Sequence, residues 1–409
     1  MNISVITSSY PRFLGDGIAP FIKSLCEAFV KINISVSVIA PFDPLVVVYE
    51  TNNVKLTRFK YFPIKSFHIM GHANSLKGDA LLRTSTYFLI PFYLFSGFFY
   101  LLVDVIKNKS DIIHVHWVLP NGLIGLFVSK LLKKPYLISL HGSDIFVSKK
   151  NRLFSNIAKV IFMNASKVTA CSYQLMSEAL SLGAQNVELI AWGADPEIFY
   201  RREVNLVYRE KFFIKENDLV VIALGRLVYK KGFENLIRIW KNVVDEIPNS
   251  KLIIGGSGPL YSFFEDLINQ YQIQETVFLP GQISWLEVPE FLSLGDIFVL
   301  PSVLDRFGNI DGLPTVLLEA MSTGCAVIAS DIAGIPLVIK NHENGLLVKP
   351  GDLEELQLCL LSLLKDSKLR ENLGFNSQTD VVNEYNWISV ANKFKTLFLD
   401  MKNPNGSNL

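Results

Sequence analysis

The 409-residue sequence has few cysteines, few charges and no histidine cluster, and each deficit excludes a class of protein. Its four cysteines, Cys26, Cys171, Cys325 and Cys359, show no paired or metal-like spacing, which predicts free thiols in a reducing compartment. The six histidines form no H-x-x-x-H pattern, so we expect no metal site. A net charge of +1 means that the chain has no large excess of positive charge to bind a polyanion, which argues against nucleic acid as a partner.

Two common signals are also missing. The dinucleotide fingerprint G-x-G-x-x-G follows neither the first apolar run nor the run Lys251–Gly255, which counts against NAD or FAD. The N-terminus resembles a strand and has no basic region or cleavage pattern, so we expect no secretion signal. Half of the residues are hydrophobic and 19% are charged, a composition that predicts a folded chain with room for two domains.

One uncharged run stands out from the rest of the sequence. Thr86–Val103 carries no charge over 18 residues, a length at the lower edge for a membrane span. Pro91 and the run's aromatic bulk favour instead a buried or interfacial helix. Basic residues precede the run, which leads to the hypothesis of a peripheral contact at the cytoplasmic face of the cell membrane. These residues are Lys65, Lys77 and Arg83.

Short, nearly continuous apolar runs alternate with helical patterns in both halves of the chain. This alternation predicts an α/β fold with two Rossmann-like, doubly wound domains, each built on a parallel sheet covered on both faces. The strands expected in the first half are Ile3–Ser8, Ile34–Ala40, Lys55–Phe59, Asp111–Trp117, Tyr136–Leu140, Lys167–Ser172 and Val187–Trp192. Those expected in the second half are Leu219–Leu224, Lys251–Gly255, Val277–Leu279, Ile297–Leu300, Ala326–Ser330 and Gly345–Val348. Helices expected between the first set include Ile18–Val30, Gly122–Leu132 and Arg152–Ala165.

The domain boundary is expected in the charge-rich stretch Tyr200–Asp218, which contains no clear strand. We therefore assign residues 1–200 to an acceptor-binding domain and 201–385 to a nucleotide-sugar-binding domain. An amphipathic helix within 386–405 has no strand after it, and we expect it to pack back on the first domain. Capping boxes predict two helix starts in the second half, at Ser284–Glu287 and Asp352–Glu355.

Two cations follow the strand Leu219–Leu224, on a loop that opens the next helix. Arg226 offers a planar fork and Lys231 a mobile point charge, and together they suit a diphosphate. The positive end of the helix dipole would lie close by. The competing interpretation is a solvated basic turn, which is how we interpret Lys230.

Two carboxylates stand eight positions apart across a loop-to-helix junction, at Asp311 and Glu319. Pro314 suits the first turn of that helix and Gly324 its end. The backbone from Gly312 through Leu313 and Pro314 to Thr315 would then form a cradle for an anion or a hydroxyl. The alternative is an acidic residue that stabilises its own helix, followed by an ordinary helical glutamate.

Weaker candidates follow other strands. Gly256, Ser257 and Gly258 would let a phosphate or a base approach the backbone. His141 could donate to a sugar hydroxyl or a phosphate, with Asp144 orienting it or binding an acceptor.

In the same half, the flexible loop Gly15, Asp16 and Gly17 would face the cleft, toward the acceptor. His114 and His116 share one face of a strand, and we interpret both as structural. Ser172 lacks the G-x-S-x-G context of a hydrolase.

Taken in order, these motifs resemble glycosyltransferase family 4, the retaining enzymes also described as glycosyl transferases group 1. The resemblance implies a GT-B fold, with the two domains facing each other across a cleft. The matching residues in the first half are Tyr10-Pro11-Arg12, His114-Val115-His116-Trp117, His141-Gly142-Ser143-Asp144 and Trp192-Gly193-Ala194-Asp195. Those in the second half are Gly225-Arg226-Leu227, Lys231-Gly232, Gly256-Ser257-Gly258-Pro259, Asp311 through Met321, Asp331 through Pro336 and Asn344 through Val348.

The resemblance implies a role for each matched side chain. Arg226 and Lys231 would bind the donor diphosphate, and Glu319 would hold the nucleotide ribose. Asp311 and the backbone of residues 312–314 would contact the donor sugar, with His141 on the opposite wall. The family usually has Glu where Asp311 stands, so the side chain here is one methylene shorter. Trp192-Gly193 likewise replaces the usual Asn-Gly.

The function expected from these residues is transfer of a sugar from a nucleotide-diphosphate sugar to a hydroxyl of a lipid-linked or polysaccharide acceptor. The product would enter cell-surface glycans such as lipopolysaccharide. No cofactor and no obligatory metal are expected. Two alternatives are a sugar-nucleotide 2-epimerase of the same fold and a non-enzymatic two-domain sugar-binding protein. The second alternative predicts a secretion signal and leaves Arg226 and Lys231 without a role.

Overall fold

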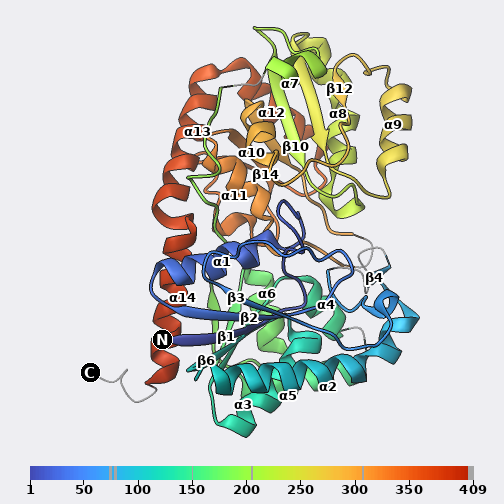
Figure 1. The fold of residues 1–409 in the computed structure, drawn as a ribbon. Helices are drawn as coiled ribbons and strands as arrows, with labels where there is room; N and C mark the ends of the chain where they lie inside the picture. The colour runs from blue at the N-terminus through green and yellow to red at the C-terminus, as the bar shows by residue number, and fades with distance from the viewer. Residues whose placement is uncertain (73–75, 78–80, 150, 204–205, 306–307, 404–409) are drawn as a thin grey trace. The chain divides into compact units, whose positions relative to one another are not determined.

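The computed structural model describes residues 1–409 apart from 73–75, 78–80, 150, 204–205, 306–307 and 404–409 (Figure 1). The chain forms two compact units. Unit 1 contains Met1–Trp192, Asp311–Leu313 and Trp387–Leu409. Unit 2 contains Gly193–Ile310 and Pro314–Asn386.

Unit 1 is built on a seven-stranded parallel sheet of order β3-β2-β1-β6-β7-β8-β9. Its central strands are short and buried, as the apolar runs predict for a sheet covered on both faces, whereas the edge strands β3 and β9 are partly exposed. They are β1 (Asn2–Ile6), β2 (Ser35–Pro41), β3 (Lys55–Phe59), β6 (Ile112–His116), β7 (Tyr136–Ser139), β8 (Lys167–Ala170) and β9 (Val187–Leu189). A separate antiparallel pair joins β4 (Leu76–Lys77) and β5 (Leu81–Leu82).

Helices cover both faces of this sheet (Figure 1). On one face, α1 packs against the C-terminal helix α14 through Phe29, Phe394 and Phe398. On the other face, α2 crosses β1, β2 and β3 while α3 covers β6 and β7. The helices of unit 1 are α1 (Pro20–Lys31), α2 (Thr84–Lys107), α3 (Leu123–Leu132), α4 (Ser143–Lys149), α5 (Arg152–Asn164), α6 (Tyr173–Ser181) and α14 (Trp387–Lys402).

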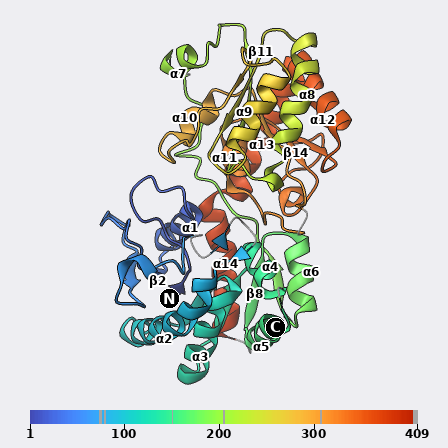
Figure 2. The ribbon, with the colours of Figure 1, turned by 90° about the vertical axis from the view of Figure 1, so that its right-hand side faces the viewer.

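Unit 2 repeats the design with a six-stranded parallel sheet of order β12-β11-β10-β13-β14-β15. Helix α8 packs beside α9 and α12, and α11 packs beside α10 and α13 (Figure 2). The strands are β10 (Leu219–Leu224), β11 (Ser250–Gly255), β12 (Val277–Phe278), β13 (Ile297–Leu300), β14 (Ala326–Ser330) and β15 (Leu346–Val348). The helices are α7 (Leu206–Lys211), α8 (Phe233–Glu246), α9 (Tyr261–Gln270), α10 (Val288–Ser293), α11 (Thr315–Ser322), α12 (Leu353–Lys365) and α13 (Ser367–Asp380).

Two such sheets with helices confirm the predicted α/β class with two Rossmann-like domains. The capping prediction at Asp352 is also confirmed, because its carboxylate accepts a 2.9 Å hydrogen bond from the Glu355 amide. The prediction of a helix start at Ser284 is wrong. Helix α10 begins at Val288, where Pro289 stands in the first turn, and Glu287 only accepts a bond from the Ser284 amide.

Both sheets have a point at which the order of strands reverses. It lies between β1 and β6 in unit 1 and between β10 and β13 in unit 2. In doubly wound sheets the loops at the carboxyl ends of these strands diverge, which leaves room for a ligand. Arg226 and Lys231 follow β10, and the segment that leads to α11 follows β13.

Candidate functional site

The loops that follow β10 and β11 are joined to each other by backbone hydrogen bonds. The Gly225 amide donates to the Gly255 carbonyl over 3.0 Å, and the Leu227 amide donates to the Ser257 carbonyl over 3.0 Å. The Leu260 amide returns a 3.1 Å bond to the Leu227 carbonyl. The backbone that carries Arg226 is therefore held in place by its neighbour before any ligand binds.

Glycine is required where these loops touch. A Cβ on Gly256 would lie 1.8 Å from the Gly225 carbonyl oxygen, and a Cβ on Gly258 would lie 2.4 Å from that of Leu227. Gly256 also has a φ of 136°, which side-chain-bearing residues rarely adopt. On the other side of the β10 loop, Gly232 approaches Pro301, which follows β13, with a hypothetical Cβ 1.8 Å from its carbonyl oxygen. The glycines thus bring the three loops together.

Substitution of Gly256 by alanine is expected to destabilise unit 2 by about 3 kcal/mol or more, because backbone strain and a clash with a carbonyl group add together. Gly351→Ala is the matched control, since Gly351 has a φ of 82° but nothing within 4 Å of the added Cβ. In Gly351→Ala the free energy of unfolding should fall by only about 1 kcal/mol, because the backbone conformation is unfavourable for alanine but no atom clashes with the added Cβ. Urea unfolding of both variants measures the difference, and equal losses would contradict the close contact.

The two cations of the β10 loop occupy different environments. Lys231 is 9% exposed, and its alkyl chain covers Gly225, since a Cβ there would lie 3.3 Å from Lys231 Cε. Arg226 is exposed. Lys231 ends a short turn, Tyr229–Lys231, and the αL residue Gly232 directs the chain from it into α8. The structure thus places one buried and one accessible cation at the carboxyl end of β10.

Helix α11 holds the second predicted carboxylate, Glu319, which is also 9% exposed. Burial raises the pKa of the Glu319 carboxyl to about 7, although the Thr315 hydroxyl one turn earlier lowers it by hydrogen bonding. Pro314 is the N-cap of α11 and Gly324, with a φ of 75°, follows its end. Among the described residues no cation acts on this pKa, and a buried carboxylate without a cationic partner is costly, which is typical of ligand-binding groups.

The tripeptide Asp311–Leu313 belongs to unit 1, although the chain segments on both sides of it belong to unit 2. Within unit 1, Gly312 packs closely against His141 and Cys171. A Cβ on this residue would lie 2.8 Å from the His141 carbonyl oxygen and 2.7 Å from Cys171 Sγ. The predicted sites at Asp311, Gly312 and His141 are thus brought together, and only glycine fits at the contact.

A chain of histidines and hydroxyls lines the carboxyl ends of β6 and β7. His116 Nδ1 and His141 Nε2 lie 3.0 Å apart, and His114 Nε2 lies 2.8 Å from Ser139 Oγ. Ser139 in turn bonds to the Thr169 hydroxyl over 2.7 Å. Burial lowers the pKa of both His114 and His141 to about 3 and that of His116 well below its usual value, so all three imidazoles are neutral at physiological pH.

Aromatic rings fix the His141 side chain. The Trp192 ring stacks on it with centroids 5.1 Å apart, and Trp117 and Phe21 lie at 4.2 Å and 5.3 Å. A neutral imidazole held in this way can serve as a hydrogen-bond partner for a hydroxyl or a phosphate. The unusual Trp192, where the family usually has Asn, is one wall of this stack.

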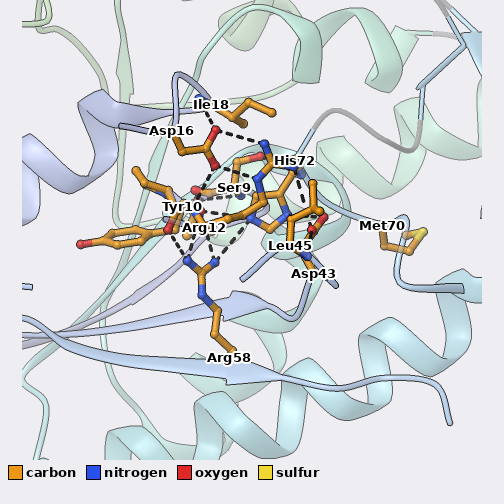
Figure 3. A network of polar contacts seen from close by, with 12 residues as sticks. Ser9, Tyr10, Arg12, Asp16, Ile18, Asp43, Leu45, Arg58, Met70 and His72 are labelled. Carbon is orange, nitrogen blue, oxygen red and sulfur yellow. Dashed lines mark hydrogen bonds and ion pairs between the residues drawn. The ribbon is translucent and has the colours of Figure 1, made fainter. Parts of the chain in front are cut away.

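A buried ionic network joins the loops that follow β1, β2 and β3 (Figure 3). The Asp16 carboxylate accepts bonds from Arg12 Nε at 2.7 Å and Arg12 Nη2 at 3.0 Å, and from two backbone amides, those of Arg12 and Ile18. Burial acts to raise the pKa of Asp16, but the Arg12 bonds outweigh it and hold the pKa below its ordinary value. Arg58 donates to the Tyr10 and Pro11 carbonyls from β3.

Within this network Asp16 stabilises the conformation of its own loop. Both carboxylate oxygens are engaged within the loop, so Asp16 shapes the loop while Gly15 and the exposed Gly17 form its outer surface. A direct contact of these three residues with an acceptor stays a prediction. Asp144 lies in α4, but its side chain is outside the described residues.

Sequence reasoning missed several polar contacts. The Arg12–Asp16 pair had a usable signal, opposite charges four positions apart. Arg58, His72 and the His116–His141 contact had none, because their partners are distant in the sequence. Among the described residues no group of three His, Cys, Asp or Glu side chains has the arrangement of a metal site. The absence of an obligatory metal stays a prediction.

Two family models match the chain. The model of glycosyl transferases group 1 matches residues 205–380, and a glycosyl transferase 4-like model matches residues 82–172. An uncharacterised glycosyltransferase of Methanocaldococcus jannaschii is 27% identical over 96% of this chain and 96% of its own length. A UDP-Gal:α-D-GlcNAc-diphosphoundecaprenol α-1,3-galactosyltransferase of Escherichia coli is 28% identical over 72% of this chain and 76% of its own.

The fold has a close counterpart among solved structures. The Anabaena protein HepE, in complex with UDP and glucose, superimposes with a TM-score of 0.73 at 16% identity, over 98% of this chain and all of that chain (100%). The superposition and the two parallel sheets show that this chain has the GT-B fold. The family models, the relatives and the doubly wound sheets agree with the motif order, and the chain belongs to glycosyltransferase family 4, with the GT-B fold and glycosyltransferase activity in glycan synthesis.

Proposed function

We propose that this chain is a retaining glycosyltransferase that moves a sugar from a nucleotide-diphosphate sugar to a hydroxyl of a lipid-linked or polysaccharide acceptor. The product would enter a cell-surface glycan, and the reaction would take place in the cytoplasm. One observation carries the proposal. The β10 loop bears Arg226 and the buried Lys231, held by backbone bonds to the β11 loop, while α11, after the neighbouring β13, bears the buried Glu319.

Each group suits one part of a nucleotide sugar. Arg226 and Lys231 suit the diphosphate, and the Glu319 carboxylate suits the ribose hydroxyls. Gly256 and Gly258 leave the backbone of the β11 loop open to a phosphate or a base. Asp311 and neutral His141 would contact hydroxyls of the transferred sugar, in the cluster that Gly312 makes possible.

The cations also account for the chemistry. As the bond between sugar and diphosphate breaks, negative charge accumulates on the leaving phosphate, and Arg226 and Lys231 would stabilise it without a metal. The acceptor hydroxyl would then attack from the face that the diphosphate leaves, which retains the anomeric configuration. The UDP-Gal donor of the E. coli relative and the UDP bound in the Anabaena complex support a uridine nucleotide as the first donor to test.

A panel of nucleotide-diphosphate sugars tests the proposal. One donor should raise the melting temperature and, with a hydroxyl acceptor, should release its nucleoside diphosphate in step with glycoside formation. The anomeric configuration of the glycoside, read by NMR, decides retention. Epimerisation of the donor without an acceptor would instead identify the alternative 2-epimerase. Binding of free sugars but of no nucleotide sugar would contradict the proposal altogether.

A further inference from the structure

Helix α2 in unit 1 has two apolar faces instead of one. Its inner face packs on the sheet through the buried Leu89, Tyr93, Gly97, Leu101 and Val105. The opposite face should be polar in a helix that borders water. It is instead a stripe of large apolar side chains spaced three or four residues apart. These are Phe88 (58% exposed), Phe92 (43%), Phe95 (69%), Phe99 (46%), Val103 (59%) and Ile106 (59%).

The neighbouring helices extend this surface. Helices α2, α3 and α5 lie on the same side of unit 1 in both views (Figures 1 and 2). Helix α3 packs on α2, where Gly97 allows Ile124 to approach, and it exposes Phe127 (57%) and Leu131 (60%). Helix α5 meets the start of α2 at the Tyr87–Phe154 ring pair. We call the exposed apolar residues of these helices, with the stripe of α2, the α2–α3–α5 face.

The charges around this face are almost all positive. Within the three helices the sequence contains one acidic residue, Asp104, which accepts hydrogen bonds from the Ser4 and Ser37 hydroxyls of the sheet. Six basic residues of these helices and of the segments that follow them are exposed. They are Lys107, Lys109, Lys130, Lys133, Arg152 and Lys159, and none of them forms an ion pair with another described residue.

An apolar surface with a cationic border suits an anionic lipid bilayer. Aromatic side chains enter the interfacial region of a bilayer, and lysines reach the lipid phosphates. A second copy of this chain is a poorer occupant, because pairing the face with itself would bring like charges together. Like-charge contacts across an interface are unfavourable.

The same structure disfavours a membrane span. Among the described residues, Thr84–Lys107 is the helix long and apolar enough to cross a membrane by length and composition. Yet the inner face of this helix is buried against β1, β2 and β3, and Asp104 is bonded to two of those strands. Removal from the sheet would break these contacts, so the helix can only lie along a bilayer.

We propose that the α2–α3–α5 face binds the surface of an anionic bilayer, with the phenylalanine stripe of α2 in the interfacial region and the bordering lysines on lipid phosphates. This binding is independent of the proposed reaction. It would place unit 1 where a lipid-linked substrate is found, and it needs neither donor nor acceptor.

Flotation of the purified full-length chain with vesicles tests the proposal. Phosphatidylcholine vesicles that contain phosphatidylglycerol should bind the protein, and salt should weaken the binding. Pure phosphatidylcholine should bind it at least about tenfold less, since each lysine near an anionic surface changes partition about fivefold.

Two paired variants separate the contributions of the apolar stripe and the charges. Phe95→Ser with Phe99→Ser, and Lys130→Glu with Lys133→Glu, should each lower vesicle binding at least about tenfold. The matched controls are Phe375→Ser and Lys368→Glu on α13, whose exposed side chains lie in unit 2. These controls should bind vesicles like the wild type, and circular dichroism should confirm that every variant is folded.

Three outcomes would overturn the proposal. The first is no vesicle binding by the wild type, and the second is equal loss in the control variants. The third is a wild-type dimer in solution that the Phe95→Ser and Phe99→Ser changes dissociate without any effect on vesicles, which would assign the face to a second copy. Donor-induced stabilisation in the absence of lipid should survive in all variants, so failure here leaves the proposed reaction untouched.

Discussion

Replacement of Lys231 by alanine is expected to lower kcat about 10²- to 10³-fold while the protein remains folded. Lys231 is 9% exposed at the carboxyl end of β10, and its stem lies over Gly225, so its ammonium group is held by the packing of its own loop. A preorganised cation stabilises the charge that develops on a departing diphosphate more strongly than a mobile one, because no reorganisation is needed. Loss of one such group typically removes about 3–4 kcal/mol of transition-state stabilisation.

Lys230 provides the control for this prediction, since it is adjacent in the same short turn and more exposed than Lys231. Lys230→Ala should change kcat less than about threefold if its charge is only that of a solvated turn. Lys231→Arg should restore activity partially at best, because a planar fork does not occupy the position of a compact ammonium. Steady-state kinetics with the donor identified in the screen, together with melting temperatures, measure all three variants. Unchanged kcat in Lys231→Ala would remove this residue from the reaction.

The strands could be predicted closely from the sequence, because buried parallel strands are marked by continuous apolar runs. Leu219–Leu224, Ile297–Leu300 and Ala326–Ser330 form strands with the predicted bounds. The spacing of apolar residues does not predict helix α13. Its buried face includes Gly374 and Ser377, and a Cβ on Gly374 would lie 2.3 Å from the Gly324 carbonyl oxygen. A helix that packs through close backbone approach carries little hydrophobic periodicity.

Residues of the candidate site could be predicted only where a side chain of suitable chemistry directly follows a predicted strand. Arg226 and Lys231 follow a strand directly, so the strand prediction alone places them at the edge of the sheet. The contact of Gly312 with His141, and that of His141 with His116, join segments far apart in the sequence. No local pattern carries such information, and a glycine required for close approach is indistinguishable in sequence from one required by a turn.

The histidines show how the structure changes the meaning of a correct motif. The sequence indicates His141 as a hydrogen-bond donor to a ligand, and His114 and His116 as structural residues. His114 packs against Phe29, Phe394 and Phe398, which supports a structural role. His116 differs, because its Nδ1 meets His141 Nε2 and therefore influences which nitrogen of His141 carries the proton. Both remain neutral, so the pair would act through hydrogen bonding rather than through charge.

Replacement of Glu319 by glutamine is expected to stabilise the unliganded protein above neutral pH and at the same time to abolish tight donor binding. Burial raises the pKa of this carboxyl from 4.5 to about 7. Between these two values the folded state holds a proton that the unfolded state has released, so stability falls as pH rises through this window. Above this window, burial of the ionised carboxylate lowers the free energy of unfolding by at most about 3 kcal/mol, at 1.36 kcal/mol per pKa unit.

The glutamine variant removes this titration with almost no change in volume, so its stability should vary less with pH across the same window. Urea unfolding at a series of pH values should show the variant more stable than the wild type at about pH 8, with the gap closing toward about pH 5. Glu371→Gln, at an exposed position on α13, is the control and should leave the profile unchanged. Lower stability of the Glu319 variant at every pH would mean that the carboxylate is a structural acceptor.

Donor binding should respond in the opposite direction, and this opposition separates a ligand-binding carboxylate from one that only supports the fold. An ionised carboxylate accepts hydrogen bonds from both hydroxyls of a ribose, whereas an amide offers one acceptor and a donor group that the diol does not need. Loss of charge-assisted bonds should weaken nucleotide binding by about 1.5–3 kcal/mol, or roughly 10- to 150-fold. In the wild type the affinity for the nucleoside diphosphate should therefore rise with pH through about 7, where stability falls, and calorimetry should show no such rise in the variant. A group that weakens the empty protein and strengthens the complex is one whose burial is compensated only by its ligand.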